Sequence, residues 1–170
     1  MNIALIGFRG TGKTTISKLL ARKLNKNLIS ADVEIAKQIN QSVERFVKKH
    51  SWDKFHDIES DTIEKISNFD DCIFDTNYNI VVRNENIVNL KRSSLVVLLT
   101  ADIRIVVSRI KNKKYISSFE KSSHLSELRN IFQELEQKYI MAADYILDTS
   151  KLSPDEVCDL IMHYVQMEIQ

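Results

Sequence analysis

The segment that most limits how this chain can fold is residues 7–14, GFRGTGKT. It matches the pattern G-x-x-x-x-G-K-[ST] and lies between an apolar stretch at residues 2–6 and a helical pattern that begins at Lys13. The chain has three glycines, and all of them lie in this segment. Because glycine tolerates backbone conformations that other residues avoid, their concentration indicates a loop whose backbone turns around a ligand. A strand, such a loop and a helix predict a phosphate-binding loop.

This loop has the chemistry that a nucleoside triphosphate requires. Inward-facing backbone N–H groups and the positive end of the following helix attract phosphate oxygens. Lys13 can reach the β- and γ-phosphates, and the hydroxyl of Thr14 can ligate Mg²⁺. We therefore predict ATP as the nucleotide and Mg²⁺ as the metal. The residues predicted to contact the nucleotide are Gly7, Arg9, Gly10, Thr11, Gly12, Lys13, Thr14 and Thr15.

The rest of the chain alternates short apolar stretches with helical patterns. Strands are predicted at residues 2–6, 27–30, 72–75, 95–100 and 145–147, with helices between them and a last helix at 153–170. Strands that are apolar throughout predict an α/β fold, a three-layer sandwich with a five-stranded parallel sheet. With no repeat or linker, residues 1–170 are expected to form a single domain. Residues 112–123 are polar and aperiodic, which predicts a mobile lid.

Composition excludes several classes of function. A net charge of +1 with interspersed charges argues against a nucleic-acid or membrane-surface binder. No apolar stretch is long enough to span a membrane, and no leader sequence is expected. Cys72 and Cys158 have no metal-ligand spacing and are expected to be reduced and buried. These features predict a cytoplasmic protein, with a monomer as the default state.

Four segments resemble the shikimate kinase family, whose members are small P-loop enzymes of the nucleoside-monophosphate-kinase-like type. The segments are GFRGTGKTTISKLLARKL (7–24), LISADVEIAK (28–37), WDKFHDIESDTI (52–63) and AADYILDTSKLSPDEV (142–157). The resemblance implies a five-stranded parallel sheet and ATP-dependent phosphoryl transfer to a hydroxyl of a small molecule. It also implies that Arg109 and Lys151 flank the adenine. For Arg109, a solvated helix charge is the alternative.

Departures from the family pattern concentrate in the region that would bind the acceptor. Ser30 replaces the first aspartate of a pair, which the family associates with magnesium, whereas Asp32 keeps the second. His56 replaces an arginine, residues 76–79 (TNYN) replace a glycine loop, and Leu135 lies near a second arginine position. The family's lid arginine has no clear match among residues 113–115. Without these arginine contacts, shikimate itself is predicted to be a poor substrate.

Five residues are candidates for the acceptor site. Asp32 follows the second strand and is interpreted as the general base or a ligand of the acceptor hydroxyl, with a helix N-cap as the alternative. His56 and Glu59 lie on the apolar stripe of one helix, either as an interior pair or at the acceptor pocket. Asn77 is also placed at the acceptor. Tyr78 either fills the space that a glycine would leave or stacks on a different acceptor.

A carboxylate at the end of the third strand could complete the metal site. Asp75 follows three apolar residues, a pattern found where P-loop enzymes hold Mg²⁺ through water, and it could compensate for the aspartate lost at Ser30. The alternative is a plain strand-end residue. Lys111, Lys113 and Lys114 could close over the phosphates, or form a solvated turn.

Three functions remain compatible with the sequence. The first is an ATP-dependent kinase acting on a small molecule other than shikimate, and the second is a nucleotide-binding pseudo-kinase with a regulatory or partner-binding role. The third is a nucleoside or nucleotide kinase, which would need a base-sized pocket near Tyr78 and His56.

Overall fold

The computed structural model describes residues 1–111 and 125–169. Five strands form one parallel sheet with the order β2-β3-β1-β4-β5. The strands are β1 (Asn2–Ile6), β2 (Asn27–Ser30), β3 (Cys72–Asp75), β4 (Ser94–Thr100) and β5 (Tyr145–Asp148). The helices are α1 (Lys13–Leu24), α2 (Ala31–Ile39), α3 (Val43–Lys49), α4 (Trp52–Ile66), α5 (Asn84–Ser93), α6 (Ile103–Lys111), α8 (Leu125–Ala142) and α9 (Pro154–Ile169). The predicted α/β class and five parallel strands are confirmed.

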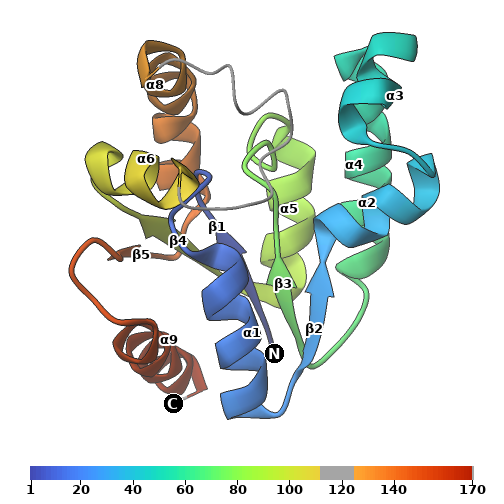
Figure 1. Cartoon of the computed structure of the whole chain (residues 1–170). Helices are drawn as coiled ribbons and strands as arrows, with labels where there is room; N and C mark the ends of the chain where they lie inside the picture. The colour runs from blue at the N-terminus through green and yellow to red at the C-terminus, as the bar shows by residue number, and fades with distance from the viewer. Residues whose placement is uncertain (112–124, 170) are drawn as a thin grey trace.

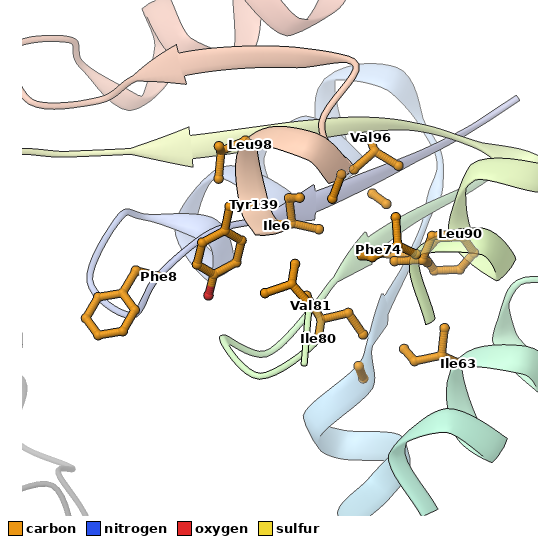
Figure 2. Close-up of a cluster of buried hydrophobic side chains, with 14 of the residues drawn as sticks. Ile6, Phe8, Ile63, Phe74, Ile80, Val81, Leu90, Val96, Leu98 and Tyr139 are labelled. Atoms are coloured by element: carbon orange, nitrogen blue, oxygen red, sulfur yellow. The ribbon is translucent and has the colours of Figure 1, made fainter. Parts of the chain in front are cut away.

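The central strand β1 is buried on both faces, which explains its unbroken apolar sequence. Successive side chains point to opposite faces of the sheet. Ile3 and Leu5 pack with residues of α1 and α9, whereas Ala4 and Ile6 pack with residues of α5 and α8. Figure 1 shows α1 and α9 on one side of the sheet, and Figure 2 shows the core on the other side.

Helices α2, α3 and α4 form a separate group beside β2. Their own apolar cluster consists of Ile35, Ile39, Phe46 and Phe55. Figure 1 shows α3 and the adjoining end of α4 beyond the tips of β2 and β3. This group therefore provides a wall above the carboxyl edge of the sheet.

The chain order of the strands reverses beside β1, whose two neighbours are β3 and β4. Ligands of open parallel sheets bind at such a switch point, outside the carboxyl ends of the strands. The loop after β1 lies there, and Gly7, Gly10 and Gly12 have φ angles of 140°, 79° and 106°. These values favour glycine, as the sequence indicated.

Gly7 tolerates no side chain. A Cβ on Gly7 would collide with the backbone carbonyl oxygen of Leu99 in β4 and would lie 3.2 Å from Thr11 Oγ1. We expect Gly7→Ala to lower the free energy of unfolding by about 2–4 kcal/mol. For a domain of this length, each kcal/mol lowers Tm by about 2–4 °C. Thermal unfolding followed by circular dichroism measures the change.

Gly12→Ala is the matched control, because its Cβ would meet nothing closer than Ile16 Cγ1 at 3.8 Å, although its φ is also positive. It should therefore be destabilised by strain alone, and less than Gly7→Ala. An unchanged Tm for Gly7→Ala would contradict the steric argument.

Candidate active site

A cavity of about 870 Å³ opens at the carboxyl edge of the sheet. It extends from the loop between β1 and α1 to the wall formed by α2, α3 and α4. Its lining includes Arg9, Gly10, Thr11, Gly12, Lys13, Thr14, Thr15, Asp32, Asn77, Tyr78 and Arg109. Most of the predicted nucleotide residues thus share one cavity with Asp32, Asn77 and Tyr78, although they come from distant parts of the chain.

The phosphate-binding end of the cavity is formed by the loop and the start of α1. Helix α1 begins after Gly12 without a side-chain cap, so its first N–H groups are available to an anion. The buried ammonium group of Lys13 donates to the carbonyl oxygens of Gly7 at 2.7 Å and Phe8 at 3.0 Å. These bonds hold the positive charge of Lys13 against the loop that would receive the phosphates.

Arg109 lines the cavity at the end where the nucleotide base is predicted to bind, the adenine end. Its guanidinium donates to the Gly10 carbonyl at 3.3 Å and to the carbonyl and hydroxyl oxygens of Thr149 at 2.9 and 3.0 Å. The Thr149 hydroxyl donates to the Thr11 carbonyl at 2.8 Å. Sequence analysis did not select Thr149. The signal that could have found it is its position directly after β5, at the carboxyl edge of the sheet. Lys151 is exposed and does not line the cavity, whereas its neighbour Leu152 does.

Asp32 lines the same cavity at the end where the acceptor is predicted to bind, the acceptor end. Helix α2 begins at Ala31 with Ser30 as its N-cap, so Asp32 belongs to the first turn and the N-cap alternative is wrong. Asp32 lines the cavity and is exposed to solvent by its accessible surface. Loss of hydration raises the pKa of Asp32 above its usual 3.8, and the charge of Asp75 adds to this rise; Lys13 and Asn77 act in the opposite direction.

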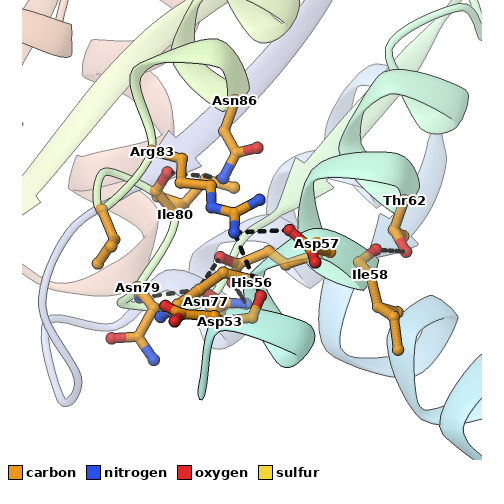
Figure 3. Close-up of polar contacts among 12 residues, drawn as sticks. Asp53, His56, Asp57, Ile58, Thr62, Asn77, Asn79, Ile80, Arg83 and Asn86 are labelled. Carbon is orange, nitrogen blue, oxygen red and sulfur yellow. Dashed lines mark hydrogen bonds and ion pairs between the residues drawn. The ribbon is translucent and has the colours of Figure 1, made fainter. Parts of the chain in front are cut away.

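A chain of buried hydrogen bonds lies behind Asp32. His56 Nδ1 is 3.1 Å from Glu59 Oε2, and the amide of Asn77 donates to Glu59 Oε1 at 2.6 Å. Asn77 Oδ1 accepts from the backbone N–H of Asn79 at 2.9 Å, as Figure 3 shows. Glu59 is fully buried, and neither it nor His56 lines the cavity. The structure therefore favours the interior pair, and direct contact of His56 or Glu59 with the acceptor stays a prediction.

Tyr78 lies in the wall that faces the acceptor end. Its ring makes an edge contact with Phe8 at a centroid distance of 6.0 Å, and the guanidinium carbon of Arg9 lies 4.2 Å from its centroid. The hydroxyl of Tyr139 donates to the backbone carbonyl of Tyr78. Leu135, at the second arginine position, is 8% exposed and packs in the same core cluster as Tyr139.

The opposite wall carries several apolar side chains beside the polar Ser42, Glu44 and Lys48, and sequence analysis did not single it out as a binding surface. The apolar side chains of this wall come from α2, α3 and α4 and are Ile35, Val43, Val47, Trp52 and Phe55. Trp52 and Phe55 lie on the same helix as His56 and Glu59, and a sequence pattern does not distinguish a core-facing apolar stripe from a cavity-facing one.

Ser30 and Asp75 are direct neighbours in the parallel pairing of β2 with β3. Ile73, two residues before Asp75, packs in the cluster with α1, so Asp75 occupies the same face of the sheet as the helix that carries Thr14. Among the described residues, no group of three or more His, Cys, Asp or Glu could hold a metal alone. This arrangement fits Mg²⁺, which is usually bound by one or two carboxylates together with substrate phosphates.

Comparison with known proteins agrees with this geometry. A model of the shikimate kinase family matches residues 9–166. The chain belongs to the shikimate kinase family. Shikimate kinase from Dehalococcoides mccartyi is 35% identical, over 94% of this chain and 90% of the relative. The shikimate kinase of Syntrophus aciditrophicus is 32% identical, over 98% and 92%.

A solved shikimate kinase from Acinetobacter baumannii, in complex with shikimate, has the same fold as this chain. Its TM-score is 0.89 at 20% identity, covering 98% of this chain and 93% of that one. Membership of the family supports an ATP-dependent small-molecule kinase. In the described part of the chain, no helix is both long and apolar enough to cross a membrane. The predicted lid, residues 112–123, lies outside the described residues.

The buried bond between Asn77 and Glu59 can be tested by mutation. Asn77→Ala should lower the free energy of unfolding by about 1–3 kcal/mol, because it removes a donor from a fully buried carboxylate. Chemical denaturation measures the loss. Asn79→Ala is the control, since Asn79 is only partly buried and its backbone N–H donor to Asn77 is retained. Equal stabilities of the two variants would contradict the role given to Asn77.

Proposed function

We propose that this protein transfers the γ-phosphoryl group of ATP to a hydroxyl of a small molecule and is a poor catalyst for shikimate. The observation that carries the proposal is that Asp32 shares one cavity with Lys13 and the phosphate-binding loop. At the two positions where the family has its substrate arginines, this chain has His56 and Leu135. Membership of the shikimate kinase family supports the reaction type.

The phosphate-binding loop would supply most of the stabilisation of the transition state. Phosphoryl transfer depends mainly on positioning and on neutralising the charge of the phosphate oxygens. When ATP is bound, the Lys13 ammonium group would leave the carbonyl oxygens of Gly7 and Phe8 and bind the phosphate oxygens instead. The side chain would stay within the same loop. Mg²⁺, held by Thr14 and by Asp75 through water, would neutralise further charge on the β- and γ-phosphates.

Asp32 would receive the proton of the acceptor hydroxyl. As the acceptor oxygen bonds to the γ-phosphorus, its O–H bond breaks, the proton passes to the Asp32 carboxylate, and ADP leaves with the bridging oxygen. A base works best when its pKa is not far below the operating pH. The raised pKa of Asp32, caused first by its loss of hydration, brings it nearer to that condition.

Shikimate would lose two charge-assisted contacts in this cavity. His56 bonds to Glu59, and Leu135 packs in the core, so neither offers a guanidinium to a carboxylate. Each such bond contributes about 1.5–3 kcal/mol, so both together correspond to about 10²–10⁴ in kcat/KM.

ATP as donor and the two buried free cysteines support a cytoplasmic location. The near-neutral net charge supports action on a small molecule and not on nucleic acid. A monomer is proposed as the working unit.

A screen for acceptor-dependent ADP release tests the proposal. The purified protein with ATP and Mg²⁺ is offered shikimate, other hydroxy acids, polyols and nucleosides. We expect turnover with a compound other than shikimate, and loss of that turnover in Lys13→Ala. Rapid turnover of shikimate would contradict the predicted specificity. ATP binding without turnover of any compound would favour a nucleotide-binding pseudo-kinase, and turnover of nucleosides alone would favour a nucleoside kinase.

Asp32→Asn separates the role of the base from that of the scaffold. With the acceptor found in the screen, kcat should fall by about 10²–10⁴, while Tm at pH 7 should equal or exceed that of the wild type. The raised pKa means that the folded protein favours the neutral form of Asp32 over the charged form. The stability that the neutral form contributes is lost as pH rises through the pKa of the folded state, so removing the charge at pH 7 should not lower Tm. For the same reason the acid limb of the wild-type kcat/KM profile, which reports the free enzyme, should lie above pH 3.8. An unchanged kcat in Asp32→Asn would rule out the base.

Asp75→Asn tests the proposed metal carboxylate. The affinity for ATP in the presence of Mg²⁺ should fall by about tenfold, the loss of one charge-assisted contact, whereas the affinity measured with EDTA should change little. Asp144→Asn is the control, because Asp144 precedes β5 and pairs with Lys91 away from the cavity. Unchanged Mg²⁺-dependent affinity in Asp75→Asn would exclude Asp75 from the metal site.

A further inference from the structure

The carboxylate of Asp32 lies beside a side-chain amide from the segment that follows the neighbouring strand. Ser30 ends β2 and is the register partner of Asp75, which ends β3. Asp32 and Asn77 each lie two residues beyond this pair, and both line the cavity. A side-chain hydrogen bond from Asn77 is one of the interactions that act on the charge of Asp32. The segments after β2 and β3 therefore meet at the group that is proposed to receive the proton.

The partners of Asn77 fix which end of its amide faces which neighbour. A side-chain amide has an oxygen that accepts and an NH₂ group that donates two hydrogen bonds. The oxygen accepts from the backbone N–H of Asn79 at 2.9 Å, and the nitrogen donates to Glu59 at 2.6 Å (Figure 3). A backbone N–H can only donate and a carboxylate accepts, so a flipped amide would lose both bonds. This orientation leaves the second N–H of Asn77 for the carboxylate of Asp32.

Burial holds the amide of Asn77 in this orientation. Asn77 is 8% exposed and Glu59 is fully buried, so water is a poor substitute for the bond between them. The other oxygen of Glu59 lies 3.1 Å from His56 Nδ1, and the His56 ring stacks on Trp52 at a centroid distance of 6.0 Å. Asn77 is thus fixed from the interior side, where its partners are themselves held in place.

Asp32 depends on such a bond for its orientation. By its accessible surface Asp32 is exposed, so packing alone does not fix the direction of its carboxylate. The last torsion of an aspartate side chain has only a broad preference. A hydrogen bond to one carboxylate oxygen restricts that torsion and leaves the other oxygen for the acceptor. Precise placement matters, because a shift of about 1 Å in a reacting group can cost about 10²-fold in rate.

We propose that Asn77 is a positioning residue, which holds the carboxylate of Asp32 in the orientation that receives the proton of the acceptor hydroxyl. This inference rests on the proposed function, because it assumes that Asp32 is the base. Asn77 belongs to the segment 76–79 (TNYN), which stands where the family pattern has a glycine loop. A glycine has no side-chain amide, so this device belongs to the sequence of this chain.

A double-mutant cycle on stability tests the contact without requiring turnover. Chemical denaturation at pH 7 compares the wild type, Asn77→Ala, Asp32→Ala and the double variant. In the wild type, Asn77→Ala removes the bonds to Glu59 and to Asp32, whereas in Asp32→Ala it removes only the bond to Glu59. The increase in the unfolding equilibrium constant should therefore be about fivefold smaller in the Asp32→Ala background.

The same cycle on kcat tests the positioning role with the acceptor found in the screen. Asn77→Ala should lower kcat by about 10- to 100-fold and leave KM for ATP within about twofold of wild type. In the Asp32→Ala background the same change should have little further effect on kcat, because residues that act through one another are not additive. Asn77→Ser, whose single hydroxyl donor cannot serve both carboxylates, replaces Asn77→Ala if that variant does not fold.

Asn86→Ala is the matched control. Asn86 is fully buried, donates to the carbonyl oxygen of Ile80 at 3.1 Å and does not line the cavity. This variant should lose stability to the same extent in both backgrounds, and it should keep the wild-type kcat.

The proposal is overturned if the stability cycle shows no coupling between Asn77 and Asp32, whatever the turnover. It is also overturned if Asn77→Ala lowers kcat by the same factor with and without the Asp32 carboxylate, or if Asn86→Ala lowers kcat as much, since a general loosening of the fold would then explain the loss. Coupling in stability without turnover of any acceptor would support the contact and contradict the proposed function alone.

Discussion

The close approach of the loop backbone to β4 at Gly7 is the constraint on which the rest of the site depends. Without a side chain there, the chain can leave β1, turn over the end of β4 and enter α1 within six residues. The turn aims the start of α1 and the Lys13 ammonium group at one point. Arg109 and Thr149 then tie the loop to α6 and to the end of β5. The nucleotide end is therefore held by backbone geometry, with few side chains required.

The acceptor end is organised by burial of a carboxylate. Glu59 is fully buried and needs donors, which His56 and Asn77 supply. Asn77 lies where the family has a glycine loop, so a side chain fills space that a glycine would leave open. Because the same amide lies next to Asp32, the interior pair and the reacting end of the cavity are linked. His56 and Asn77, which both differ from the family pattern, therefore bind the same buried carboxylate.

Sequence patterns predicted the elements and the phosphate-binding loop well, because both follow from local rules. An apolar run of four residues predicts a buried strand, three clustered glycines predict a turn around a ligand, and a helical period predicts a helix. Strand ends differed by at most one residue. His56 and Glu59 were harder, since a polar residue on an apolar stripe has the same pattern whether it faces a cavity or an interior partner.

The sequence by itself determined the α/β class, the phosphate-binding loop and the departures from the shikimate kinase pattern, since each depends on residues close together in the chain. Tertiary structure decided which candidates share a cavity. It brought Arg9 onto Tyr78, set Ser30 beside Asp75 in the sheet, and turned Glu59 towards Asn77. These pairs are separated by 18 to 69 residues. The physical reason is that their contacts depend on strand order and helix packing, which no local pattern records.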